Sequence, residues 1–428
     1  MSAGSPATSA PVAQQVVVIG GGIIGVSAAR ELVLAGHEVT LVDEGVAAGS
    51  SAGNAGLLVP SYATPMSTPQ NLLAGVSSFG REGSPLTLSA PVRPSTAAWL
   101  ARFALACRPG RVRRDTARLL ELARWSHDAY HRLQDEGLDL GLRRSGWLWT
   151  STAAEPAALR RTASRLRAAG AVCEVVDAEG AHALEPGLAQ DVRAGIWFPE
   201  ESVLDPATAT RALFDDARRH GVRWEPARVL GCRRSAGRVQ AVRTTRGDVE
   251  ADHVVIATGA DTRAVGRLFG LRVPIEAGYG WSVTLRDDVG VLAHPLLDVE
   301  RHVVISPLRG QVRITGGMEL GGRPGSTPRP QDVQRLQEVG RALVPALGGL
   351  EQVAAWRGAR PMTASGLPLV EGARGLAGVT VAAGHGPLGM TLAPSTARRV
   401  VQQVADDRAR RPRSPAAADP PPPRRNDS

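Results

Sequence analysis

The sequence predicts an α/β fold, in which a discontinuous domain with a parallel sheet is joined to an α+β domain with an antiparallel sheet. Patterns of period 2 and period 3.6 alternate along the whole chain, as expected when strands and helices alternate. Residues 16–25 form a Val/Ile-rich run that ends in a glycine turn, and a second apolar run stands at residues 252–260. Two buried strands so far apart in the chain indicate one sheet assembled from distant segments.

The first element is a strand, turn, helix and second strand within residues 15–43. In this pattern Gly20 allows a tight turn, Gly22 lets the backbone approach a pyrophosphate, and Gly25 lets the helix pack closely on its strand. The helix runs to about residue 36, and its positive end favours an anion. Asp43 ends the second strand where an adenosine ribose hydroxyl needs an acceptor. Together these residues predict a Rossmann-like dinucleotide site.

The later run at residues 252–260 is too distant to belong to the same βαβ unit, and no second G-x-G-x-x-G motif accompanies it. We therefore expect it to add a strand to the first sheet. The nucleotide-binding domain would then comprise residues 15–75, 200–270 and 350–405, and the substrate domain residues 76–199 and 271–349.

Three further elements can be read from local patterns. Residues 113–133 have apolar positions at helical spacing and predict a long amphipathic helix. Residues 146–150 predict a strand. Residues 206–220 predict a helix that Asp205 caps, with proline in its first turn. Residues 1–14 and 406–428 are poor in apolar residues, and we expect both to be disordered.

Composition excludes several classes of protein. The chain has 428 residues, of which 43% are hydrophobic, and no apolar run of about eighteen residues that predicts a spanning helix. Its first fourteen residues carry no basic start and no apolar core, so we expect no signal peptide. Cys107, Cys173 and Cys232 are too widely spaced to support a disulfide framework or a zinc site. We expect a cytoplasmic protein with reduced thiols and no metal.

The formal net charge of +9 raises the question of nucleic acid. Every basic residue is an arginine, and alanine, glycine and proline are abundant, which is typical of a GC-rich genome. Part of the excess lies in the basic tail around residues 408–413. We therefore expect no nucleic-acid partner, while a weak peripheral contact with an anionic membrane face is left open.

Three more segments carry a family resemblance. They are residues 50–62, 356–368 and 383–391, which contain the runs SSAGNAGLLVPSY, WRGARPMTASGLP and AGHGPLGMT. Together with the first glycine turn they resemble the FAD-dependent D-amino-acid oxidase superfamily, and within it most closely the small subunit of bacterial D-amino-acid dehydrogenases. The resemblance covers about residues 15–405.

The resemblance implies FAD in an extended pose, with adenine at the first glycine turn and the isoalloxazine ring between the two domains. A glycine-rich turn that opens a helix is suited to stabilise negative charge on a reduced flavin. The chain has no lysine to activate oxygen, no cysteine in the flavin-proximal segments, and no histidine beside residues 50–56. We therefore expect non-covalent FAD and a dehydrogenase that passes electrons to a quinone or another carrier.

The expected cofactor-binding residues are Gly20, Gly22, Ile23, Ile24, Gly25, Asp43, Ser50, Ser51, Asn54, Gly56, Thr258, Gly259, Gly384, Gly386, Leu388, Gly389 and Thr391. Three residues are expected at the catalytic centre. Arg360 precedes a proline and is the candidate for a bidentate clamp on a substrate carboxylate. Tyr279 matches the family's Gly-Tyr position, from which its hydroxyl could donate to the same carboxylate; a core aromatic residue on a strand is the equally weighted alternative. His385 is interpreted as a flavin-proximal hydrogen-bonding group rather than a base.

The implied reaction is oxidative deamination of a D-amino acid by hydride transfer from Cα to flavin N5, which yields a 2-oxo acid and ammonia. Imino acids such as D-proline or hydroxyproline, and glycine or sarcosine, are the alternative substrates. An NAD-dependent dehydrogenase would use the same first turn, but it leaves residues 384–391 unexplained. A non-catalytic nucleotide-binding subunit is the third alternative.

Overall fold

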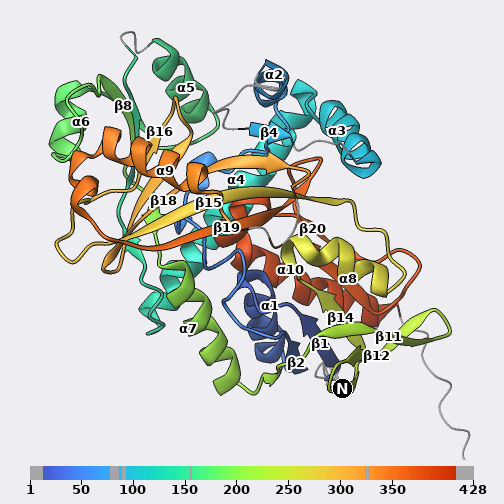
Figure 1. The fold of residues 1–428 in the computed structure, drawn as a ribbon. Coiled ribbons are helices and arrows are strands. Elements are labelled where there is room, and N and C mark those ends of the chain that lie inside the picture. Colours follow the sequence, from blue (N-terminus) through green and yellow to red (C-terminus); the bar gives the residue numbers. More distant parts are fainter. Residues whose placement is uncertain are drawn as a thin grey trace, which may run out of the picture.

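The computed structural model describes residues 13–77, 86–88, 93–153, 157–322, 325 and 327–410. Two separate sheets dominate it, a small parallel one and a large mixed one (Figure 1). Most residues of the two segments expected to be disordered lie outside the described residues. No helix in the described part of the chain has the length and apolar character that crossing a bilayer requires.

The parallel sheet has the order β10-β2-β1-β14-β21-β20, and only β20 runs antiparallel to its neighbour. Its strands are β1 (Gln15–Ile19), β2 (Glu38–Val42), β10 (Arg223–Glu225), β14 (His253–Ile256), β20 (Leu369–Gly372) and β21 (Val379–Ala383). Strand β14 pairs directly with β1, so the expectation that the later apolar run joins the first sheet is confirmed.

Both faces of the parallel sheet are buried, which explains why its strands are nearly continuous apolar runs. Val16 and Val18 face the helices α1 (Ile23–Leu34), α7 (Pro206–Arg219) and α10 (Gly389–Ala409). Val17 and Ile19 face the other way, toward a three-stranded sheet. That sheet consists of β11 (Val229–Ser235), β12 (Arg238–Thr244) and β13 (Gly247–Glu250).

The large sheet has nine strands, in the order β19-β15-β18-β17-β16-β6-β8-β7, with β4 paired to β18. They are β4 (Leu86–Leu88), β6 (Trp147–Ser151), β7 (Glu174–Asp177), β8 (Ala194–Phe198), β15 (Ile275–Arg286), β16 (Leu296–Asp298), β17 (Val303–Leu308), β18 (Gln311–Leu320) and β19 (Gln352–Thr363). Most of its pairs are antiparallel, as the predicted α+β domain requires. A third, small sheet joins β3 (Leu57–Leu58), β5 (Arg143–Arg144) and β9 (Ser202–Val203).

The remaining helices are α2 (Pro69–Ser77), α3 (Pro94–Ala106), α4 (Pro109–Asp135), α5 (Ala157–Ala168), α6 (Ala178–Leu184), α8 (Thr262–Leu268) and α9 (Pro330–Leu343). Short 3₁₀ turns stand at η1 (Pro60–Tyr62), η2 (Gly259–Asp261), η3 (Pro345–Gly349) and η4 (Gly386–Leu388). Helix α9 covers one face of the large sheet (Figure 1), where Leu336 and Val339 pack on Trp281 and Ile314.

The locally predicted elements are present within a few residues of their expected bounds. The helix expected over 113–133 is α4, the strand expected over 146–150 is β6, and the helix expected over 206–220 is α7. The Asp205 side chain caps α7 by accepting a hydrogen bond from the Thr208 amide at 2.8 Å. The chain leaves α7 at Gly221, which has a φ of +106°.

Three expected boundaries differ from the structure. Residues 406–409 are the last turn of α10 rather than the start of a disordered tail, because Asp407 forms an ion pair with Arg238 at 2.9 Å. Gln14, expected to be disordered, is buried and accepts a hydrogen bond from the Glu38 amide. Strand β19 belongs to the large sheet through its pairing with β15, so residues 352–363 do not lie in the parallel-sheet domain.

Candidate functional site

The turn between β1 and α1 is compact enough to require glycine at two of the expected positions. Gly20 has a φ of +117°, and a Cβ added there would lie 2.5 Å from the carbonyl oxygen of Ala257. A Cβ on Gly25 would lie 1.8 Å from the carbonyl oxygen of Gly20. Helix α1 therefore begins in close contact with the ends of β1 and β14. Its N-cap residue is Gly22, which has no side chain that could accept a hydrogen bond from the first amide groups of the helix.

Asp43 and Ser51 lie against this helix start. The Asp43 Oδ2 accepts a hydrogen bond from the Gly21 amide at 2.7 Å, and its Oδ1 accepts one from the Gly45 amide at 2.8 Å. The Ser51 Oγ accepts one from the Ile23 amide at 3.0 Å. Thr258 and Gly259 follow β14 into the turn η2 at the same edge of the sheet. The structure thus brings the first group of expected cofactor residues together where the parallel strands end.

The segment that contains Ser50, Asn54 and Gly56 leads from the parallel sheet to the large one. The Ser50 hydroxyl donates to the carbonyl oxygen of Ala359 on β19 at 2.8 Å. The Asn54 Oδ1 accepts a hydrogen bond from the Gly56 amide at 2.8 Å. Gly56 has a φ of +78°. A Cβ added there would lie 2.2 Å from the carbonyl oxygen of Leu204, so this position has no room for a side chain.

Arg313, which the sequence did not single out, holds this segment from the large sheet. Its Nη1 donates to the carbonyl oxygens of Ala52 and Asn54 at 2.6 and 2.9 Å, and its Nε donates to the Thr284 Oγ1 at 3.2 Å. Desolvation lowers its pKa. Thr284 and Arg313 are paired across β15 and β18, so this face of the large sheet is the one that meets the expected cofactor segment.

The turn at residues 384–391 closes the site from the C-terminal side. Gly384 has a φ of +86°, and His385 forms an isolated backbone bridge with Met362 at the end of β19. Leu388 is buried, and Gly389 begins helix α10 without a side-chain cap. The Thr391 hydroxyl donates to the carbonyl oxygen of Leu57 at 3.2 Å, which links this turn to the segment after residue 50.

Arg360 lies on the same face of the large sheet as Thr284 and Arg313. Arg360 is paired with Gly278 of β15. A Cβ added at Gly280 would lie 2.4 Å from the Arg360 Nη1, so the guanidinium lies over Gly280. Its Nη1 donates to the carbonyl oxygen of Gly317 at 2.7 Å. Desolvation alone lowers its pKa to about 10. Among the described residues no carboxylate is paired with this partly buried cation.

Tyr279 lies on the opposite face of the sheet from Arg360, which favours the alternative of a core aromatic residue over a carboxylate shared with Arg360. Neighbouring residues of a strand point to opposite faces, and Tyr279 is opposite Ala359 while Gly278 is opposite Arg360. The Arg357 guanidinium carbon lies 3.7 Å from the centre of the Tyr279 ring. Tyr279 therefore packs against the Arg357 guanidinium on this face.

The face of the large sheet that holds Tyr279 is covered by an ion pair and by the apolar cluster under α9. Arg357 forms an ion pair with Glu319 at 2.7 Å, and the next residue on this face, Trp281, belongs to the apolar cluster under α9. Burial raises the pKa of Tyr279. These contacts give Tyr279 a packing role.

His385 turns its ring into helix α10. Its side chain is buried, its Nε2 lies 2.8 Å from the Thr396 Oγ1, and desolvation lowers its pKa to about 4. The imidazole is therefore neutral near physiological pH. This geometry favours a residue that holds the turn in place, and the expected hydrogen bond from His385 toward the flavin stays a prediction.

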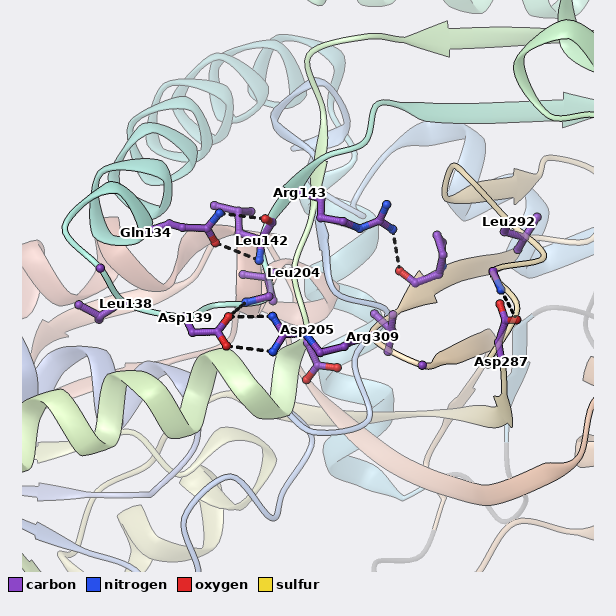
Figure 2. Close-up of a pocket in the computed structure, with 16 residues that line it drawn as sticks. Gln134, Leu138, Asp139, Leu142, Arg143, Leu204, Asp205, Asp287, Leu292 and Arg309 are labelled. Atoms are coloured by element: carbon purple, nitrogen blue, oxygen red, sulfur yellow. Dashed lines mark hydrogen bonds and ion pairs between the residues drawn. The ribbon is translucent and has the colours of Figure 1, made fainter.

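A groove of about 500 Å³ lies elsewhere, between the end of α4 and the β17–β18 turn. Figure 2 shows that its charged side chains are already paired: Asp139 binds Arg309 through both oxygens, and Arg143 donates to the carbonyl oxygen of Pro307. None of the expected site residues lines it. The described residues also include no cluster of three His, Cys, Asp or Glu side chains suited to a metal ion.

Comparison with protein families matches residues 15–403 to the DAO family, which is described as FAD dependent oxidoreductase. Among curated proteins, the D-amino acid dehydrogenase of Rhizorhabdus wittichii is 32% identical over 393 residues, which cover 89% of this chain and 93% of that protein. The D-amino acid dehydrogenase of Cereibacter sphaeroides is 34% identical over 414 residues, which cover 92% of each.

Two solved structures share the fold. Glycine oxidase from Bacillus cereus superposes with a TM-score of 0.72 at 21% identity, covering 92% of this chain and 95% of that one. L-proline dehydrogenase from P. horikoshii superposes with a TM-score of 0.70 at 21% identity, covering 92% and 94%. At this level of identity the superpositions establish the mixed α/β architecture.

Proposed function

The chain belongs to the DAO family of FAD-dependent oxidoreductases, and we propose that it oxidises D-amino acids to 2-oxo acids with release of ammonia. The substrate class is taken from relatives named D-amino acid dehydrogenase, which match about nine-tenths of the chain. The feature of this molecule that supports it is Arg360, a desolvated cation on the cofactor-facing side of the sheet with no carboxylate partner among the described residues.

The residues that would hold FAD fit an extended dinucleotide. Gly20 and Gly25 let the turn and the start of α1 pack closely on the strands, because a Cβ at either position would collide with the backbone, and Gly22 would let the backbone approach a pyrophosphate. Asp43 stands at the end of β2, where it would exchange a backbone partner for a ribose hydroxyl. The uncapped start of α10 would face the flavin end with amide groups that stabilise negative charge. When bound, FAD supplies the acceptor for the hydride lost from Cα.

In this proposal the protein contributes mainly orientation. Arg360 would bind the substrate carboxylate through two parallel hydrogen bonds, which fixes the position of Cα. Gly280 leaves room for that arrangement, since any side chain there would meet the guanidinium. The neutral amine loses the Cα hydrogen with its electron pair to become an imino acid, and water hydrolyses the imino acid to the 2-oxo acid and ammonia.

The electron acceptor in this proposal is a quinone or another carrier. The chain has no lysine to activate oxygen, and the FAD would be held without a covalent bond because none of the three cysteines lies in the cofactor segments. Imino acids, and glycine or sarcosine, are the alternative substrates.

A visible spectrum of the purified protein and an anaerobic titration test the proposal. We expect flavin absorbance that denaturation releases as free FAD, and bleaching by D-alanine but not by L-alanine. Preferential bleaching by D-proline or sarcosine would support an alternative substrate. A protein that takes up no FAD, or one bleached equally by both enantiomers, would contradict the proposal.

A further inference from the structure

A second cavity is lined by residues of helices α3 and α8 and of the chain that leads into β15. Its volume is about 490 Å³, which is within the roughly 300–1,000 Å³ typical of small-molecule sites. Arg360 is not among the residues that line it. The cavity therefore adjoins the carboxylate clamp proposed above without including Arg360, since Trp99 donates to the carbonyl oxygen of Met362 on the same strand, and the inference does not depend on that function.

Four arginines from three segments converge on this cavity. Arg102 lies on the face of α3 that also carries Trp99, and Arg263 and Arg267 are one turn apart on α8. Arg272 approaches from the chain before β15. Among the described lining residues the only acid is Glu276, whose Oε2 lies 3.3 Å from Arg263 Nη1.

This arrangement leaves positive charge uncompensated. The side chains of Arg102, Arg267 and Arg272 belong to exposed residues, and within the described part of the chain they have no ion pair or hydrogen bond. Like charges four residues apart on a helix repel each other weakly, and Arg263 and Arg267 stand at this spacing on α8. A bound anion would offset this repulsion with charge-assisted hydrogen bonds.

The wall beneath the arginines is apolar. Trp99 is buried, and its Nε1 donates to the carbonyl oxygen of Met362 at 3.1 Å, which fixes the orientation of the indole ring. Val273 and Ile275 are buried beside it. An inorganic anion would bind the arginines but would make no contact with these apolar residues.

We propose that the cavity between α3 and α8 binds an amphipathic anion, with a phosphate or carboxylate head on the arginines and an apolar body against Trp99. Such a molecule could be a free metabolite or the head-group region of an anionic lipid, and both share this chemistry. The separate α3–α8 site would let the enzyme respond to an anion that is not its substrate.

Isothermal titration of the FAD-loaded protein with octyl phosphate tests the inference. We expect saturable binding to one site, at least tenfold tighter than that of inorganic phosphate, and weakened at least tenfold in Arg267→Gln/Arg272→Gln. The control Arg335→Gln/Arg374→Gln removes two exposed arginines elsewhere and should bind as the parent does. Equal affinity in both double variants would overturn the proposal.

Two further variants keep the test specific. Ala98→Trp fills the cavity without a change of charge, and it should also weaken binding at least tenfold. Arg360→Ala should leave octyl phosphate affinity unchanged, and loss of binding only in that variant would place the anion in the clamp and refute the second site. Competition by vesicles of anionic phospholipid supports a lipid source, whereas octyl phosphate binding without vesicle binding supports a free metabolite.

Discussion

Arg360 and Tyr279 offer a matched pair of substitutions, because they lie on adjacent pairs of the same two strands but on opposite faces. Arg360→Ala should raise KM for a D-amino acid and leave the FAD content normal. Two charge-assisted hydrogen bonds at about 1.5–3 kcal/mol each predict an increase of at least about 100-fold. Arg360→Lys keeps the charge without the planar fork, so we expect a smaller increase, on the order of tenfold.

Tyr279→Phe removes a hydroxyl on the α9 side, and KM should change less than about twofold. The assay is steady-state kinetics with an artificial electron acceptor, with FAD content measured by absorbance in every variant. A KM for Tyr279→Phe that rises as much as that of Arg360→Lys would refute the assignment of faces. Loss of FAD in Arg360→Ala would instead place this arginine in the cofactor site or the core.

Three other substitutions test the cofactor site and the buried charges. Gly25→Ala places a methyl group 1.8 Å from a carbonyl oxygen, so FAD content should fall and urea stability should drop by at least about 1–3 kcal/mol; normal FAD uptake would contradict this. Burial raises the pKa of Glu201 from 4.5 to about 7, so the folded state holds its proton longer than the unfolded state and parent stability should fall as pH rises through this range. Glu201→Gln should be up to about 3 kcal/mol more stable above pH 7, and equal urea midpoints there would exclude the buried ionisation. Arg313→Gln should release the carbonyl oxygens of Ala52 and Asn54 and lower FAD affinity in a dialysis assay, whereas an unchanged affinity would limit Arg313 to packing.

The parts of the site that could be predicted are those whose cause is local in the chain. Gly20 is required by its φ of +117° in the turn, and Gly25 by the carbonyl oxygen of Gly20 in the same turn, so the pattern of glycines was enough to locate them. The pairing of β14 with β1 also followed from the sequence, because a buried strand with no second glycine turn needs an existing sheet.

The two roles weighed for Tyr279 could not be separated from the sequence, because the face of a residue depends on strand register. Gly278 and Arg360 are 82 residues apart, and a shift of one residue in the pairing of β15 with β19 would have moved Tyr279 to the cofactor side. Arg313 was missed for a related reason. It is one of fifty arginines, and its distinguishing contacts are two backbone carbonyl groups about 260 residues away, which carry no side-chain signal. Residues that act through pairing register or through backbone acceptors can therefore be assigned only once the strands have been placed.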